Sequence, residues 1–502
     1  MYRIVLSIGR VIRGGFWLTL GLLLSNFFGF VYWLVVSALV PPEVVGRVAA
    51  ILGVEGLTLA MLNLGIPVGI QRFLGKHYGA GDLQSLSRYH CTALVFLMLV
   101  SVCAGLAFLV MAFSGIGFAS LDPDMLFFTG ALIIIGLNGW PLLGAAFFNS
   151  ILKTEYITVV SLLTGIVRLS VGIVLVYLGL GFLGVVSGYL AAALATSILM
   201  LVLPLRALRQ LAGRLVVDFS VLGEVVRAGI FSWIPSLSRL AGQWLGVLGV
   251  YGFIGTFETG VYFIAYTITL AIFGLSTSVL QLMFPTLSGM ADGRKRAMSR
   301  VVRLTTTITY PIIFVLILYP WVIPSFLGDK YLPASPLIQI MAMGYILQPI
   351  ILGYTYYAYA AGKYFDVMAV GLAENIPRLV LYALLGAFFK DTGVAMAFSL
   401  GSLSALISVI PLSKRSGFVF NRSELLKTAS IPAGMAFAMR LLSPHWLIGT
   451  ITIVMTSFFL YIKLRIITKE DLRELAKAFL PDATINRVYR YSRPILWLLF
   501  GE

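Results

Sequence analysis

Long apolar segments joined by short polar loops occupy most of this chain, and they constrain its fold more than any other feature. About 20 apolar residues are enough for a helix to cross a bilayer, and the 502 residues contain fourteen such segments. Only 11% of the residues are charged, against about 25% in an average soluble domain. We therefore expect an all-α polytopic membrane protein with about 14 transmembrane helices. The segments lie near 15–39, 44–70, 89–113, 125–150, 156–178, 182–204, 229–251, 258–283, 302–324, 334–360, 364–388, 392–412, 426–442 and 446–464.

The distribution of lysine and arginine supports this helix count and gives an orientation. With a cytoplasmic N-terminus, 29 of the 36 basic residues fall in the termini and the cytoplasmic loops. Only Arg47, Lys330 and Lys390 fall in the external loops. Basic residues collect on the cytoplasmic side of membrane proteins, so we expect both termini in the cytoplasm and the protein in the cell membrane. Topology then explains the net charge of +16, which attracts anionic membrane lipids and does not require a nucleic-acid partner.

Cysteine and histidine usage gives no indication of a metal or redox centre. The only cysteines, Cys91 and Cys103, lie in one apolar segment, and the three histidines do not cluster with them. Buried cysteines of this kind usually act as small apolar residues. We expect no metal site and no cofactor.

A weak internal repeat suggests two structurally related halves. At an offset of 210, residues 63–82 align with 273–292, and Gln71, Gly79 and Asp82 meet identical residues. Both segments end an apolar helix and enter a basic loop, so the repeat predicts two six-helix bundles in the same orientation. Transporters built in this way bind substrate between the halves. The predicted units are an N-terminal lobe at 1–204, a cytoplasmic linker at 205–228, a C-terminal lobe at 229–412, two additional helices at 413–464, and a cytoplasmic amphipathic and basic tail at 465–502.

Five short motifs, in order and over roughly residues 15–420, carry a family resemblance. They are Asn63–Phe73 with Gly79–Asp82, Phe284–Ser288, Phe326–Tyr331, Ala361–Lys363 and Gly393–Ala397. In these segments the chain resembles the polysaccharide transporter or oligosaccharide flippase branch of the multidrug/oligosaccharidyl-lipid/polysaccharide (MOP) exporter superfamily. The resemblance implies that lipid-linked oligosaccharides are moved between the two leaflets. It assigns no binding residue, because the charged residues of the family's cavity vary.

Three arginines, Arg168, Arg239 and Arg378, lie near the middle of predicted transmembrane helices. An arginine there costs about 2.5–3.5 kcal/mol to insert, so we expect each to face a cavity, a partner or a ligand. Ser236 and Gln243 share one helical face with Arg239. A guanidinium donates paired hydrogen bonds to phosphate oxygens. These five residues are the candidate substrate-binding residues, and a purely structural arginine is the alternative in each case.

Two acidic residues, Glu55 and Glu374, are candidates for ion coupling or ion pairing. Glu374 lies four residues before Arg378, so the two side chains can pair on a single helix. Glu55 is isolated in the first half of the chain. It could carry a proton, bind Na⁺, or pair with one of the buried arginines. We favour the ion pair, because arginines outnumber acidic residues at this depth.

Together these features predict a membrane transporter that flips a lipid-linked oligosaccharide, on a polyprenyl phosphate or pyrophosphate carrier, by alternating access. Its partners would be that substrate, membrane lipids and a coupling ion, with H⁺ and Na⁺ both left open. An ion-coupled multidrug or amphiphile antiporter is the alternative, although a cationic midplane suits cationic drugs poorly. A membrane glycosyltransferase is a more distant alternative, because the external loops are too short for a catalytic domain. Enzymatic activity is therefore not expected.

Overall fold

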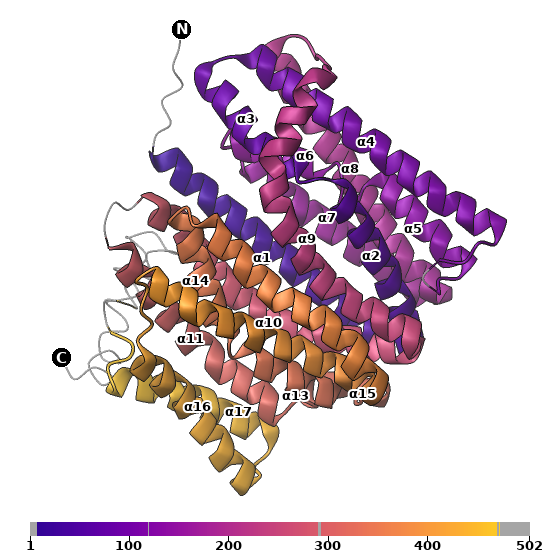
Figure 1. The fold of residues 1–502 in the computed structure, drawn as a ribbon. Helices are drawn as coiled ribbons and strands as arrows, with labels where there is room; N and C mark the ends of the chain where they lie inside the picture. Colours follow the sequence, from indigo (N-terminus) through magenta and orange to yellow (C-terminus); the bar gives the residue numbers. More distant parts are fainter. Residues whose placement is uncertain (1–7, 119, 290–292, 469–470, 472–502) are drawn as a thin grey trace.

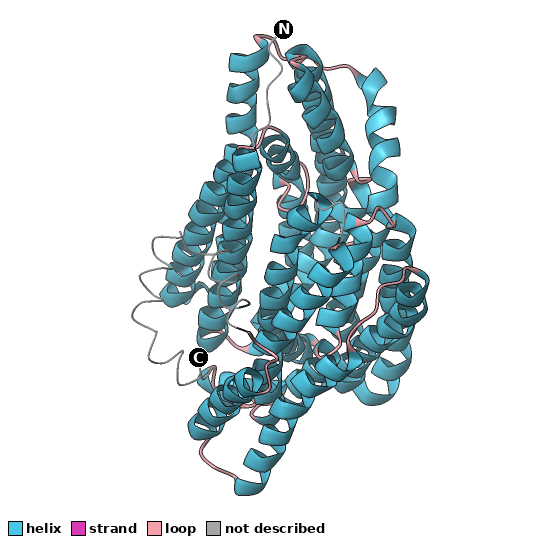
Figure 2. Ribbon diagram, turned by 90° about the vertical axis from the view of Figure 1, so that its left-hand side faces the viewer, coloured by secondary structure: helices cyan, strands magenta, loops and turns pink. Residues whose placement is uncertain are grey.

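The structure, a computed structural model, describes residues 8–118, 120–289, 293–468 and 471, and this part of the chain is helical without strands (Figures 1 and 2). The all-α prediction is confirmed. The α-helices are α1 (Ile8–Leu39), α2 (Pro42–Leu62), α3 (Ile66–Ala80), α4 (Leu83–Ser114), α5 (Pro123–Ile135), α6 (Leu142–Ser150), α7 (Glu155–Leu175), α8 (Gly181–Ala212), α9 (Leu222–Phe253), α10 (Thr256–Gly289), α11 (Arg294–Leu318), α12 (Val322–Phe326), α13 (Ala334–Tyr345), α14 (Gln348–Ala360), α15 (Tyr364–Arg415), α16 (Arg422–Leu442) and α17 (Trp446–Lys463). Short 3-10 or π turns connect some of them: η1 (Val176–Leu180), η2 (Phe219–Val221) and η3 (Asp329–Tyr331).

Within the described residues, eight helices are long and apolar enough to cross a membrane, or nine if the bent pair α13–α14 forms one span. Two of these stretches, 155–212 and 364–415, contain 58 and 52 residues, far more than the roughly 20 that one span needs. Each leaves the helical conformation near its middle, at Gly179 and at Lys390. The chain is a multi-pass membrane protein, and the count of fourteen spans stays a prediction.

Three predicted helices are broken in the structure, and glycine or proline marks two of the breaks. The segment 44–70 is interrupted at Asn63–Gly65, where Gly65 has a φ of +72°. The segment 125–150 is interrupted between Gly136, with a φ of +85°, and Pro141. The segment 334–360 bends by 43° between α13 and α14. Glycine adopts positive φ without the strain that other residues incur, and hydropathy alone does not register such breaks.

The helices form two groups with α1 and α9 between them (Figure 1). Helices α2 to α8 lie on one side, and α10 to α15 lie on the other. Helix α1 packs against α7 and α10, whereas α9 packs against α2, α3 and α15. Helices α16 and α17 pack on each other and on α11, at the edge of the second group. The helix ends that carry Arg88, Arg227 and Arg294 are called the basic end below.

Two backbone contacts between the groups require glycine. Gly46 on α2 lies so close to α10 that an added Cβ would be 2.0 Å from the Thr256 carbonyl oxygen. A Cβ added to Gly260 on α10 would likewise lie 1.9 Å from the Pro42 carbonyl oxygen. Toward the basic end, a Cβ on Gly229 of α9 would lie 2.3 Å from the Gly65 carbonyl oxygen. The first group therefore touches α10 at one level and α9 at the other, backbone to backbone.

The connection between the groups is shorter than the linker predicted at 205–228. Helix α8 continues to Ala212 and α9 begins at Leu222, so only residues 213–221 lie between them. Hydrogen bonds from Ser220, and then the charge of Arg88, hold the pKa of the Asp218 carboxyl below its usual range. The amphipathic helix predicted in the tail falls mostly on residues 469–470 and 472–502, which lie outside the described residues.

Candidate functional site

A cavity of about 310 Å³ lies between the two groups of helices. Along the chain from Gly46 to Gly65 it falls between the two backbone contacts, because Leu52 on α2 lines it. On α10, Tyr266 lines it as well. Ser25 and Asn26 of α1 are exposed at its edge. Among the described residues, the lining is Ser25, Asn26, Gly29, Phe30, Trp33, Leu52, Leu137, Asn138, Arg168, Tyr189, Gln243, Trp244, Phe263, Tyr266, Thr267, Leu270 and Ala271.

Of the described residues that line this cavity, Arg168 on α7 is the one that is charged. Its guanidinium carbon lies 5.4 Å from the ring centre of Tyr32 and 5.3 Å from that of Tyr189. These distances are typical of cation–π contacts. The Tyr32 hydroxyl donates a 2.8 Å hydrogen bond to the Val185 carbonyl, which fixes one of the two rings. Among the described residues Arg168 has no ion-pair partner, and its buried Nε has no hydrogen-bond acceptor. The structural alternative for Arg168, a buried ion pair that holds two helices together, is thus not found in the described part of the chain.

Glu55 is fully buried behind the cavity and bonds to Asn138. Its Oε2 accepts a 2.7 Å hydrogen bond from the Asn138 side-chain amide, and its Oε1 accepts a 3.2 Å bond from the Asn138 backbone N–H. Asn138 lies in the break between α5 and α6, and it also lines the cavity. The ion pair that we favoured for Glu55 is therefore not formed in this conformation. Both carboxylate oxygens accept hydrogen bonds from Asn138, and no arginine of the described chain contacts them.

The predicted stripe on α9 is divided by the structure. Gln243 lines the cavity together with Arg168. Arg239, one turn closer to the basic end, is exposed and outside the lining, and Ser236 is partly buried. Arg239 lies within electrostatic range of Tyr356 and Tyr359 on α14. The three residues share a helix, but only Gln243 reaches the cavity in this conformation.

Arg378 is outside the lining of the cavity and belongs to a buried network inside the second group. It pairs with Glu374 at 2.9 Å, and the Gln348 amide donates a 2.7 Å hydrogen bond to the same carboxylate. Its guanidinium also donates to Asn375 at 3.2 Å and lies 4.2 Å from the Phe398 ring centre. The structural alternative for Arg378 and Glu374, a local ion pair, matches this geometry.

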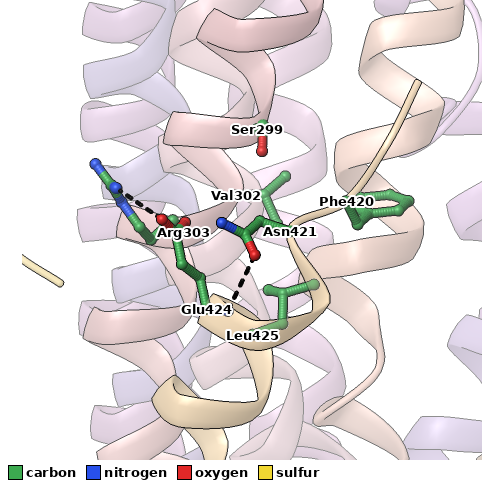
Figure 3. A pocket seen from close by; sticks show the side chains of 7 residues that line it. All are labelled: Ser299, Val302, Arg303, Phe420, Asn421, Glu424 and Leu425. Carbon is green, nitrogen blue, oxygen red and sulfur yellow. Dashed lines mark hydrogen bonds and ion pairs between the residues drawn. The ribbon is translucent and has the colours of Figure 1, made fainter. Parts of the chain in front are cut away.

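A second ion pair, away from the cavity, joins the basic ends of α11 and α16 (Figure 3). Arg303 lies 3.6 Å from the Glu424 carboxylate, and the Asn421 side chain accepts a hydrogen bond from the Glu424 backbone N–H. The space between these side chains is about 10 Å³, enough for one water molecule at most. This cluster attaches α16 to the second group and has no room for a ligand.

Sequence patterns missed the aromatic and amide part of the cavity. Trp33, Tyr189, Trp244 and Phe263 line it, and the Trp33 and Phe263 rings lie 4.8 Å apart. In an apolar helix such rings have the same sequence signature whether they face lipid, core or cavity. Asn26, a polar residue inside the first apolar segment, was the one signal in the sequence that could have located this wall.

The comparisons with known proteins agree with this architecture. A sequence model of a family described as polysaccharide biosynthesis protein matches residues 35–336. No curated protein sequence matches the chain.

Solved structures share the fold at low sequence identity. The chain is similar to the lipid II flippase MurJ in an inward closed conformation, with a TM-score of 0.72, 13% identity, and 88% of this chain and 99% of that chain covered. An inward-facing multidrug resistance MATE family transporter of the MOP superfamily gives 0.59 and 15%, with 82% and 95% covered. A MOP superfamily transporter from Pyrococcus furiosus gives 0.58 and 13%, with 81% and 96% covered.

Proposed function

Because the chain belongs to the polysaccharide biosynthesis protein family, within the MOP superfamily, we propose that it flips a lipid-linked oligosaccharide across the cell membrane. The observation that carries this proposal is an unpaired arginine in a cavity between two helix groups. An arginine at this depth is costly unless it serves a ligand or a partner, and Arg168 has no ionic partner in the described chain. An anionic substrate would complete the site.

The chemistry of Arg168 suits a phosphate or pyrophosphate. Tyr32 contacts the guanidinium through its ring, and Tyr189 contacts it through its ring and by a side-chain hydrogen bond, so most of its N–H donors are left for a ligand. A planar guanidinium then offers two parallel hydrogen bonds to phosphate oxygens. The carrier phosphate would bind there, with the polyprenyl chain left in the membrane.

The remaining lining suits sugars. Trp33 and Trp244 provide flat apolar surfaces, and the amides of Asn26, Asn138 and Gln243 provide donors and acceptors for hydroxyl groups. A cavity of about 310 Å³ lies at the lower end of the usual range for ligand pockets. A headgroup of several sugars therefore requires the two groups to separate at one level, as alternating access supposes.

Arg239 would act earlier in the same path. It is exposed, one helical turn from Gln243 toward the basic end, which is the predicted cytoplasmic side. In the proposed sequence Arg239 attracts the phosphate from the cytoplasmic leaflet, and Arg168 holds it once the headgroup enters the cavity. Release follows when the contact between Gly46 and α10 opens.

The drug-antiporter alternative has less support. A cavity for cationic drugs needs a carboxylate, and the described lining contains none, since the Glu55 carboxylate is occupied by Asn138 behind it. The similarity to a multidrug transporter concerns the fold alone. We keep the flippase as the proposed function.

Substrate binding tests the proposal directly. Native mass spectrometry of the purified protein with a synthetic polyprenyl-pyrophosphate disaccharide should show a one-to-one complex. Arg168→Gln should weaken it about tenfold or more, since a charge-assisted hydrogen bond contributes roughly 1.5–3 kcal/mol. Arg422→Gln, an exposed arginine on α16 away from the cavity, is the control. Equal binding by all three proteins would refute the proposal, as would a preference for a cationic dye over the pyrophosphate.

A further inference from the structure

A second cavity, of about 510 Å³, lies at the edge of the second helix group and shares no residue with the central one. It is formed where α11 ends and where α16 turns into α17. This level is the end of the helices opposite the basic end. Its polar wall contains Arg440, Ser443 and His445, and its aromatic wall contains Trp321 and Trp446.

The positive charge of this cavity is unpaired. Arg440 is exposed, and within the described residues its guanidinium has neither an ion-pair partner nor a hydrogen-bond acceptor. Topology does not account for this charge, because lysine and arginine are rare at this end of the helices. The cation therefore lacks both a structural partner and a role in orienting the chain.

The surroundings of Arg440 match the boundary between lipid headgroups and acyl chains. Trp446 packs edge-on against Phe326, with ring centres 6.2 Å apart, and tryptophan is enriched at this boundary. Next to the arginine, the side chains of Leu441 and Leu442 are 71% and 72% exposed. An arginine with apolar neighbours of this kind can hold a phosphate while the leucines contact hydrocarbon.

We propose that this cavity binds the phosphate group of a membrane phospholipid in the leaflet opposite the basic end, through the Arg440 guanidinium. The acyl chains would lie along the exposed leucines of α16 and the start of α17. A phospholipid bound there would contact both the pair α16–α17 and the end of α11, because Leu318 and Tyr319 at the end of α11 form the other wall. It would thereby stabilise the packing of α16–α17 on α11. The site is independent of the central cavity and of the proposed transport activity.

Lipid retention measured by native mass spectrometry tests this site. The purified protein is titrated with phosphatidylglycerol in detergent, and with diacylglycerol as the matched lipid without phosphate. We expect one tightly retained phosphatidylglycerol and no retained diacylglycerol. Arg440→Ala should weaken that binding about tenfold, Arg440→Lys should weaken it less, and Arg422→Ala at the basic end of the same helix should leave it unchanged.

Three results would overturn the proposal. One is equal retention by the wild type and Arg440→Ala, with both proteins folded by thermal unfolding. Another is displacement of the phospholipid by millimolar inorganic phosphate, which would mark a free-anion site. The third is preferential retention of undecaprenyl phosphate that Arg440→Ala removes, which would assign the cavity to the transported carrier. Should Arg440→Ala express poorly, Arg440→Gln keeps the length of the side chain and must give the same loss.

Discussion

The Glu55 carboxylate and Asn138 are joined by two hydrogen bonds, of 2.7 and 3.2 Å, across 83 positions of sequence. One comes from the Asn138 side chain and the other from its backbone, in the non-helical segment between α5 and α6. The buried carboxylate thus accepts a hydrogen bond from a backbone N–H in this break, and a polar backbone group inside the membrane needs such a partner. The same asparagine forms part of the cavity wall, so this pair links the shape of the cavity to the interior of the first helix group.

This pairing predicts a modest effect for Glu55→Gln. Glutamine keeps one acceptor, so the free energy of unfolding should fall by about 1 kcal/mol, against the roughly 3–5 kcal/mol expected for breaking a buried ion pair. Combining it with Asn138→Ala should give less than the sum of the two single effects, because both remove the same contact. Thermal unfolding of the four proteins in detergent measures this. Strict additivity would show that the two side chains act separately.

Arg378 should behave as a structural residue. Arg378 is buried against Asn375 and Phe398 and pairs with the partly buried Glu374, so Arg378→Ala leaves a largely buried carboxylate without its cation. We expect a loss of about 3–5 kcal/mol in stability and a much smaller loss for Arg168→Gln, which breaks no ion pair. Thermal unfolding of the two variants, each compared with the wild type, measures these losses of stability. If Arg168→Gln proves the more destabilising change, the roles assigned to the two arginines are reversed.

The contact of Gly260 with Pro42 should control access to the cavity from the end opposite the basic loops. A Cβ on Gly260 would lie 1.9 Å from the Pro42 carbonyl oxygen, so Gly260→Ala must push α2 and α10 apart. The measurement is labelling of a cysteine placed at Gln243, in a protein free of Cys91 and Cys103, by an impermeant thiol reagent applied from that side. Labelling should accelerate in Gly260→Ala. Gly252→Ala, at a position with open space around it, is the control, and equal rates would contradict the role of this contact.

Cysteine labelling in whole cells tests the predicted orientation. Arg214 and Leu332 are both exposed, and they lie in connections predicted to face the cytoplasm and the outside. A cysteine at Leu332 should react with the impermeant reagent, and one at Arg214 should react only after the membrane is permeabilised. Ser416, in the predicted cytoplasmic connection after α15, is not used for labelling, because its side chain is buried and hydrogen-bonded to Tyr354. Labelling of Arg214→Cys in intact cells would overturn the orientation.

Sequence reasoning found the apolar helical segments and singled out Arg168, which lines the cavity, and its failures have physical causes. Apolar length and charge asymmetry indicate membrane helices directly, and Arg168 stood out because arginine is costly at that depth. The partner of Glu55 could not be found, since an asparagine 83 residues away carries no charge signal. Arg239 and Gln243 share a helical face, yet one turn of displacement along α9 places only the second in the cavity. Trp33 and Trp244 could not be assigned to the cavity from the sequence, because aromatic rings are equally compatible with lipid, the protein core and a cavity.

Transport in proteoliposomes tests the central claim most directly. The protein is reconstituted with a fluorescent polyprenyl-pyrophosphate sugar, and flipping is followed by the fraction of probe that a membrane-impermeant quencher reaches. The wild type and Arg422→Gln should flip the probe at the same rate. Arg168→Gln should reduce the rate by about tenfold or more, and Arg239→Gln should reduce it with thermal stability unchanged. Unimpaired flipping by Arg168→Gln would contradict the claim that this arginine holds the carrier phosphate in the cavity.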